Sequence, residues 1–349
     1  MSLCAACAFA DVSKRNWRGR GTPKLIRKET DKVGSNTSCD HLISHEPGII
    51  PQETGRLTYE RYVGAILFTY NFSNFVFTHL IKSMSTEETL KGKIAYERVA
   101  KQFGVKIKAY RADNLRFNDK DFTDHCNKTD QEYAYYGVGS HHQNGIAEVK
   151  NKTVSYGARK VLLHARRKWP TVMKASLCSF ALLADTKRDN EMSRDESGKS
   201  PVEIFAGIEA EIHCEDFHTW GCPVFILVEE NQSGLTGTPK WEPRARVGVY
   251  LGHSPTHAGN VALVLNLQTG HVSPQYHLVF DDGFTTVEYI ESGNEPPNWC
   301  KLVQDFSERL TDEQYNIDRT WYTGVDAINT HKTCDSTLIV PEDTGNLRE

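Results

Sequence analysis

The pattern of apolar and polar positions first becomes clear in two neighbouring, mostly apolar runs, residues 65–70 and 75–81, and a polar stretch at 71–74 separates them. Both runs are rich in β-branched and aromatic residues, so they predict a β-hairpin. Ser85, followed three residues later by Glu88, has the spacing of a capping box and predicts that a helix begins there. The predicted apolar face of this helix consists of Leu90, Ile94, Val99 and Phe103.

This helix is predicted to end at Gly104, after which the chain continues to alternate between strands and helices. A strand over residues 105–110 places Asp113 just beyond its carboxyl end. The next predicted elements are a short helix at 119–126, a strand at 132–138 and a long helix at 144–168. The order hairpin, helix, strand, helix, strand, helix predicts an α/β fold with a mixed sheet.

From Phe217 onward the pattern changes to short strands separated by Gly and Pro. The predicted strands are 223–228, 246–251, 260–267 and 272–280, with a hairpin turn at 266–270. This pattern predicts a small, separate β-barrel. One helix at 311–321 is predicted within the acidic stretch that follows. The resulting division is a basic arm at 1–35, a core at 36–205, a barrel at 206–290 and an acidic linker and tail at 291–349.

Composition narrows the class of protein. The 349 residues are 39% hydrophobic, 10% aromatic and 25% charged, which argues against wholesale disorder, collagen and coiled coil. No apolar run approaches the roughly 20 residues that cross a bilayer, and the first residues lack the basic segment of a secretory signal. Nine cysteines, an odd number, do not form a disulfide framework. We therefore expect a soluble intracellular protein without membrane contact.

Charge is distributed unevenly although the net charge is only -4. Eight basic residues lie within 14–32 and seven within 148–169, and such runs bind phosphate when they are not simply solvated surface. By contrast, residues 281–319 hold ten acidic and three basic residues, a composition that repels nucleic acid. The expected DNA contacts are Lys14, Arg15, Arg18, Arg20, Lys152 and Arg159, together with Asn144 and Gly145 at the start of the long helix.

Three carboxylates lie where the predicted α/β fold gathers functional groups. Asp40 lies in a short β-like run, Asp113 follows a strand and Glu148 lies in the first turn of the long helix. Carboxylates held close together favour divalent cations between them, and two Mg²⁺ or Mn²⁺ ions support in-line displacement at a phosphodiester. A single Asp at a strand end is more often a turn or cap residue, so the hypothesis depends on the three carboxylates converging.

Four motifs resemble the integrase region of copia-type LTR retrotransposon polyproteins. They are HHQNGIAE at 141–148, RADN at 111–114, PKW at 239–241 and VYLGHS at 249–254. The resemblance extends from Cys4 to about Trp321. It implies an RNase H-like catalytic core of the retroviral integrase type, with a mixed five-stranded sheet flanked by helices, followed by a small SH3-like barrel.

The resemblance also implies roles for residues. Asp40, Asp113 and Glu148 take the three positions of a catalytic, metal-binding D, D, E triad, and 34 residues separate the last two. The implied activity is processing of DNA ends and their joining to target DNA, with two Mg²⁺ or Mn²⁺ ions as cofactors. DNA and further copies of the chain are the implied partners, a small-molecule substrate is not expected, and the nucleus is the expected compartment of an active enzyme.

The sequence departs from that family at several positions. Cys4 and Cys7 resemble the second half of a His-His-Cys-Cys zinc module, and the sequence offers only His41 and His45 as replacement ligands, with unsuitable spacing. Stoichiometric zinc is therefore not expected. Val149 replaces a usual Arg or Lys, and Leu115 replaces a usual Gly. These departures favour the alternative that the chain is a catalytically inactive, repurposed nucleic-acid-binding protein of the same fold; nothing in the sequence specifically favours a plain scaffold.

Overall fold

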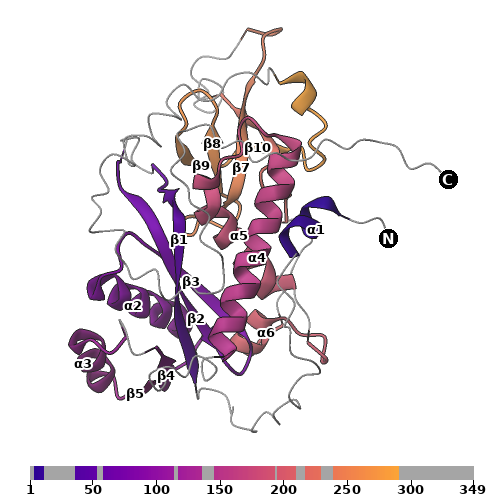
Figure 1. The fold of residues 1–349 in the computed structure, drawn as a ribbon. Helices are drawn as coiled ribbons and strands as arrows, with labels where there is room; N and C mark the ends of the chain where they lie inside the picture. The colour runs from indigo at the N-terminus through magenta and orange to yellow at the C-terminus, as the bar shows by residue number, and fades with distance from the viewer. Residues whose placement is uncertain are drawn as a thin grey trace, which may run out of the picture. The chain divides into compact units, whose positions relative to one another are not determined.

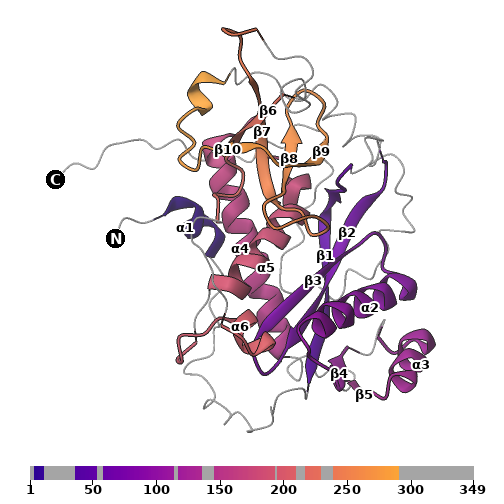
Figure 2. The same cartoon turned by 180° about the vertical axis from the view of Figure 1, so that it is seen from behind.

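The computed structural model describes residues 4–11, 36–52, 58–113, 117–135, 145–192, 195–209, 217–228 and 239–290. All of them belong to one compact unit that spans residues 1–299. Two sheets and a set of helices make up this unit (Figures 1 and 2). None of the helices in these ranges is long and apolar enough to cross a membrane.

The first sheet is mixed and has five strands in the order β3-β2-β1-β4-β5. Its strands are β1 (Thr37–Ile49), β2 (Arg61–Tyr70), β3 (Phe75–Ile81), β4 (Ala109–Ala112) and β5 (Glu132–Tyr135). The pairs β1–β2 and β2–β3 are antiparallel, whereas β1–β4 and β4–β5 are parallel. This topology, with helices on both faces, confirms the predicted RNase H-like class.

The predicted hairpin is confirmed with its predicted turn. Tyr70 pairs with Phe75 across the turn, and Asn74 has a φ of 60°, a backbone conformation that Asn adopts more readily than most residues. Side chains of β2 alternate between the two faces of the sheet, as the period of two requires. Leu67 contributes to an apolar cluster with α4 and α5, while Phe68 contributes to a second cluster with α2 and α3.

Helices cover both faces of the mixed sheet (Figure 1). They are α1 (Ala5–Asp11), α2 (Thr86–Gln102), α3 (Lys120–Lys128), α4 (Gly145–Lys168), α5 (Cys178–Met192) and α6 (Pro201–Ala206), with a short 3-10 turn at Ala175–Leu177. The long helix α4 matches the predicted helix at 144–168 over residues 145–168. The helices α1, α5 and α6 were not predicted: α1 lies in the segment expected to be an arm, and α5 has little amphipathic pattern because most of its faces are covered.

The predicted start of α2 is confirmed, but its predicted buried face is wrong. The Ser85 hydroxyl accepts a hydrogen bond from the Glu88 backbone N–H at 3.3 Å. Ile94, expected in the core, is exposed, whereas Lys93 beside it is fully buried. The buried face instead consists of Thr89, Gly92, Lys93, Tyr96 and Ala100. Polar partners compensate the Lys93 charge, which a pattern of apolar positions alone does not reveal.

The second sheet is antiparallel and has the order β10-β6-β7-β8-β9. Its strands are β6 (Pro223–Leu227), β7 (Ala245–His253), β8 (Ala262–Asn266), β9 (Val272–Gln275) and β10 (Leu278–Phe280). The single predicted strand at 272–280 is therefore wrong, because it divides into β9 and β10 on opposite edges of the sheet. Two residues connect those edges, a reach of about 10 Å, so the sheet curls as a small barrel does.

The second sheet packs in one apolar cluster with α4 and α5, which cover one face of the first sheet. Trp169 at the end of α4 and Phe180 of α5 belong to one buried cluster with Val249 and Leu263 of the second sheet. Gln52 adds polar contacts: its backbone N–H donates to the Val272 carbonyl at 2.8 Å, and its side-chain oxygen accepts from the Val272 N–H at 2.9 Å. In this way Gln52 occupies hydrogen-bonding groups of the edge strand β9.

Candidate carboxylate site

The sheet register places Asp40 beside Asp113. Asp40 lies on the central strand β1, and Asp113 directly follows β4. These strands are parallel, with Ser38 opposite Arg111. Two further residues along each strand bring Asp40 level with Asp113, and adjacent strands lie about 4.8 Å apart. Asp40 and Asp113, two of the three predicted metal ligands, therefore occupy neighbouring positions in the sheet.

Helix α4 connects the third carboxylate to the same place. Glu148 is exposed in the first turn of α4, and Asn151 lies one turn later, on the same side of the helix. The Asn151 side-chain amide donates to Asp40 Oδ2 at 2.5 Å and to the His41 carbonyl at 3.4 Å. Sequence reasoning missed Asn151, although its spacing of three residues from Glu148 was the available signal.

The surroundings of Asp40 disfavour its charged form. Burial raises the pKa of Asp40 to about 7; hydrogen bonds from Asn151 and from the His41 backbone N–H oppose this shift, and the charges of Asp113 and Glu148 add to it. Burial is the main cause of the shift, and the smaller contributions of Asp113 and Glu148 show that negative charges lie near Asp40. A cation is the species that such an arrangement accommodates.

The residues fit a hard divalent cation by chemistry, but their side chains do not yet converge on one point. Carboxylate and amide oxygens are the ligands that Mg²⁺ prefers. The Asn151 Oδ1 atom is buried and has no hydrogen-bond partner, so a cation-bound water would satisfy it. However, within the described ranges no three His, Cys, Asp or Glu side chains are grouped closely enough to hold one metal ion. Metal binding therefore requires side-chain rotation, including a change at the bond between Asn151 and Asp40.

Two of the expected DNA-binding residues lie on one exposed face of α4. Lys152 and Arg159 are exposed, and both lie near the ring of Tyr156, at 5.4 and 5.5 Å from its centroid. Val149 on the same side of the helix is 63% exposed. Gly145 begins α4, and a side chain there would have open space around it. Lys14, Arg15, Arg18, Arg20 and Asn144 lie outside the described residues.

The cysteine pair lies at the start of α1. Cys4 is exposed just before the helix and Cys7 is half-buried within it. Hydrogen bonds from the Cys7 backbone N–H and thiol lower the pKa of Cys4. His41, the replacement ligand considered above, has other contacts. Its ring centroid lies 4.6 Å from that of Phe117, and its Nε2 lies 3.2 Å from the Thr89 hydroxyl. The expectation about zinc stays a prediction.

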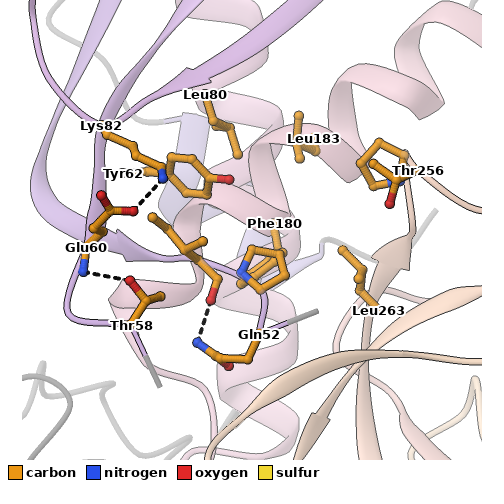
Figure 3. A pocket seen from close by; sticks show the side chains of 13 residues that line it. Gln52, Thr58, Glu60, Tyr62, Leu80, Lys82, Phe180, Leu183, Thr256 and Leu263 are labelled. Atoms are coloured by element: carbon orange, nitrogen blue, oxygen red, sulfur yellow. Dashed lines mark hydrogen bonds and ion pairs between the residues drawn. The ribbon is translucent and has the colours of Figure 1, made fainter. Parts of the chain in front are cut away.

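A cavity of about 470 Å³ lies apart from the three carboxylates (Figure 3). Its walls come from the end of β1, from β2 and β3, from α5 and from the second sheet. Lys82 and Glu60 form an ion pair of 2.5 Å on one wall, and Leu263 lies on the opposite side. None of Asp40, Asp113 and Glu148 lines this cavity, so it is not the carboxylate site.

Comparisons with known proteins find only distant structural similarity. No model of a known protein family and no curated protein sequence matches the chain. The HTLV-2 integrase catalytic core domain, solved with magnesium in a trimeric form, is 14% identical over 50% of this chain and 97% of its own length, with a TM-score of 0.35. A simian T-cell lymphotropic virus intasome in complex with the PP2A regulatory subunit B56 gamma is 13% identical over 79% and 87%, with a TM-score of 0.40.

Proposed function

We propose that this chain is a metal-dependent polynucleotidyl transferase of the integrase type, related to copia-type retrotransposon integrases, which nicks and joins DNA ends. The observation that carries the proposal is the meeting of β1, β4 and α4 around Asp40. The register brings Asp40 level with Asp113, and the hydrogen bond from Asn151 ties the helix that bears Glu148 to the same carboxylate. The motif resemblance supplies the reaction class.

In this proposal each residue has a distinct task. Asp40 and Asp113 hold Mg²⁺ or Mn²⁺, and Glu148 completes the ligand set. The two ions, when bound, activate a water or a 3′-hydroxyl and stabilise the leaving oxygen of an in-line displacement. Without metal, the Asn151 amide holds Asp40 through its hydrogen bond to Oδ2, and this bond is given up when a cation takes its place. The His41 N–H, which donates to Asp40 Oδ1, keeps the carboxylate oriented in both states.

DNA is the proposed substrate, bound through phosphate contacts. Lys152 and Arg159 on α4 extend away from Glu148 along one face, so a strand bound there would enter the carboxylate site. Lys14, Arg15, Arg18, Arg20, Asn144 and Gly145 complete the proposed DNA contacts, and homo-oligomer formation and a nuclear location of the active protein belong to the same proposal. These contacts read phosphates rather than bases, so we expect little sequence preference on duplex DNA.

The direct test is strand nicking and joining on a short labelled duplex with Mg²⁺ or Mn²⁺, comparing the wild type with Glu148→Gln. The substitution keeps the side-chain shape and removes one charge, so turnover should disappear while salt-dependent DNA binding remains. Ca²⁺, which is larger and looser in coordination, should support binding with little chemistry. Equal activity of wild type and variant would show that the activity arises elsewhere.

A second candidate function is DNA binding without catalysis. Its supporting observation is that Asn151, rather than a cluster of acids, occupies Asp40 Oδ2, and that no three metal-ligating side chains of the described residues are grouped for one ion. In that case DNA binding falls steeply with salt, but neither Mg²⁺ nor Mn²⁺ produces a nicked or joined product.

A further inference from the structure

Helix α1 begins with two cysteines that lie one helical turn apart. Cys4 directly precedes the helix and is exposed, whereas Cys7 lies within it and is half-buried. Cys7 donates hydrogen bonds from its backbone N–H and its thiol to the Cys4 sulfur. Cα atoms three residues apart on a helix lie about 5 Å from each other, and disulfides span about 4.4–6.8 Å between Cα atoms. The two cysteines are therefore close enough to form a disulfide.

The surroundings of Cys4 favour its reactive form. The thiolate is the nucleophile in thiol chemistry, and hydrogen-bond donors and positive charge stabilise it. Cys4 has both, since Cys7 supplies two donors and Arg167 in the last turn of α4 supplies positive charge. α1 lies beside α4 in both views, with Ala6 and Ala10 buried (Figures 1 and 2). Packing of α1 against α4 therefore fixes the cysteine pair in this environment.

The other cysteines in the described ranges lack this combination of exposure and a neighbouring thiol donor. Three of them are buried, namely Cys39, Cys126 and Cys222. Cys178 is half-buried, and its thiol lies 3.7 Å from the Ser44 hydroxyl and 3.7 Å from the Glu46 carbonyl. A Cys-x-x-Cys pair with an accessible first cysteine is, by contrast, an arrangement that proteins use for exchange with disulfides.

We infer that Cys4 and Cys7 form a thiol–disulfide exchange site whose oxidant is a small disulfide such as glutathione disulfide. The Cys4 thiolate attacks one sulfur of glutathione disulfide and releases one glutathione thiolate, which leaves a mixed disulfide on Cys4. The Cys7 thiol then loses its proton to solvent and attacks the Cys4 sulfur, which releases the second glutathione. In total the two cysteines lose two electrons and two protons, and glutathione disulfide gains them as it becomes two glutathiones.

The test is mass spectrometry of the full chain after incubation in glutathione buffers that range from fully reduced to fully oxidised. Free thiols are then labelled with N-ethylmaleimide in denaturant, and the chain is digested with trypsin. The tryptic peptide that ends at Lys14 contains Cys4 and Cys7 and no other cysteine. We expect it to carry two labels when reduced, none after oxidation, and two again after dithiothreitol. Cys178 is the internal control and should stay labelled at every ratio, because its half-buried thiol has no cysteine partner among its printed contacts.

Two variants separate the roles of the cysteines. Cys7→Ser removes the second thiol, so the reaction should stop at the mixed disulfide, with one glutathione on Cys4. Cys4→Ser leaves only the half-buried thiol, which should react with iodoacetamide at pH 7 about tenfold more slowly than Cys4 does in Cys7→Ser. Glu148→Gln should oxidise like the wild type, so this proposal and the proposed catalysis succeed or fail independently.

Two results would overturn the inference. One is a peptide that never loses both labels to an internal disulfide, whether it stays fully labelled in glutathione disulfide or only gains glutathione on separate cysteines. The other is stoichiometric zinc that a chelator must remove before Cys4 reacts, because the two thiols would then be metal ligands rather than an exchange site.

Discussion

The buried ammonium of Lys93 offers a sharp test of how the core around β4 is stabilised. Lys93 lies on α2 with no exposed side-chain surface. Its Nζ donates to Glu97 Oε1 at 2.6 Å and to Gln131 Oε1 at 2.7 Å, and it lies 2.7 Å from His125 Nδ1. Glu97 also accepts from the Tyr110 hydroxyl at 2.7 Å. These contacts join α2 and α3 to β4, the strand that precedes Asp113.

The perturbation is Glu97→Gln, which keeps the side-chain shape but leaves the Lys93 charge buried without its counterion. Burial raises the pKa of Glu97, but the hydrogen bond and charge of Lys93 outweigh burial and lower it overall, so Glu97 is ionised at neutral pH. Removing one partner of a buried pair costs about 3–5 kcal/mol. Replacing both, in Lys93→Met with Glu97→Gln, should recover much of that loss because no unpaired charge remains.

Urea denaturation followed by circular dichroism at pH 7 measures these differences. The matched control is Lys91→Met on the same helix, whose ammonium is half exposed and pairs with Glu87 and Glu88. Exposed pairs contribute about 0–1 kcal/mol, so this variant should change stability little. A loss below about 1 kcal/mol for Glu97→Gln, or a double variant as unstable as the single one, would refute the account of a desolvated ion pair.

Three further outcomes are expected. Burial raises the pKa of Asp185 to about 6, partly offset by Arg188, so the free energy of unfolding falls as pH rises from about 4 to 6 and Asp185 ionises. In urea titrations at several pH values, the wild type should lose about 3 kcal/mol across that window relative to Asp185→Asn. Parallel plots of unfolding free energy against pH for the two proteins would contradict this. A Cβ on Gly157 would lie 1.7 Å from Asp185 Oδ2, so Gly157→Ala should lose about 1–3 kcal/mol in urea denaturation, whereas Gly145→Ala, with open space, should lose none; equal effects would refute the packing argument. A chelator should leave the melting temperature unchanged, and stoichiometric zinc by elemental analysis would contradict the expectation that zinc is not bound.

Much of the fold follows from local patterns that the sequence displays openly. The hairpin of β2 and β3 was predictable because its strands are rich in β-branched and aromatic residues and its turn is polar. The start of α2 was predictable because Ser85 caps it. The buried face of α2 was not predictable in this way. From the sequence alone, Lys93 is expected on the surface. Its burial depends on contacts with Glu97, Gln131 and His125, which lie one helical turn away or on other elements.

The candidate site divides in the same way. Asp113 was predictable as a strand-end residue, but Asp40 is the fourth residue of the 13-residue β1 and becomes its neighbour only through the register of β1 with β4. Asn151 was not predictable, because its role depends on how α4 crosses β1. The division of residues 272–280 into two strands also escaped prediction, since the curl that takes the chain from one edge of the sheet to the other depends on tertiary packing.

The central claim is that Asp40, Asp113 and Glu148 together bind divalent metal. Anomalous diffraction from crystals of the protein grown with Mn²⁺ tests it most directly, because each manganese position is then located independently of any activity. The account predicts manganese contacting Asp40 and Asp113, with Glu148 joining when a second ion binds about 3.5–4 Å away and the Asn151 amide displaced from Asp40 Oδ2. No manganese at these carboxylates at millimolar concentration, with the Asn151 to Asp40 bond intact, would contradict the claim.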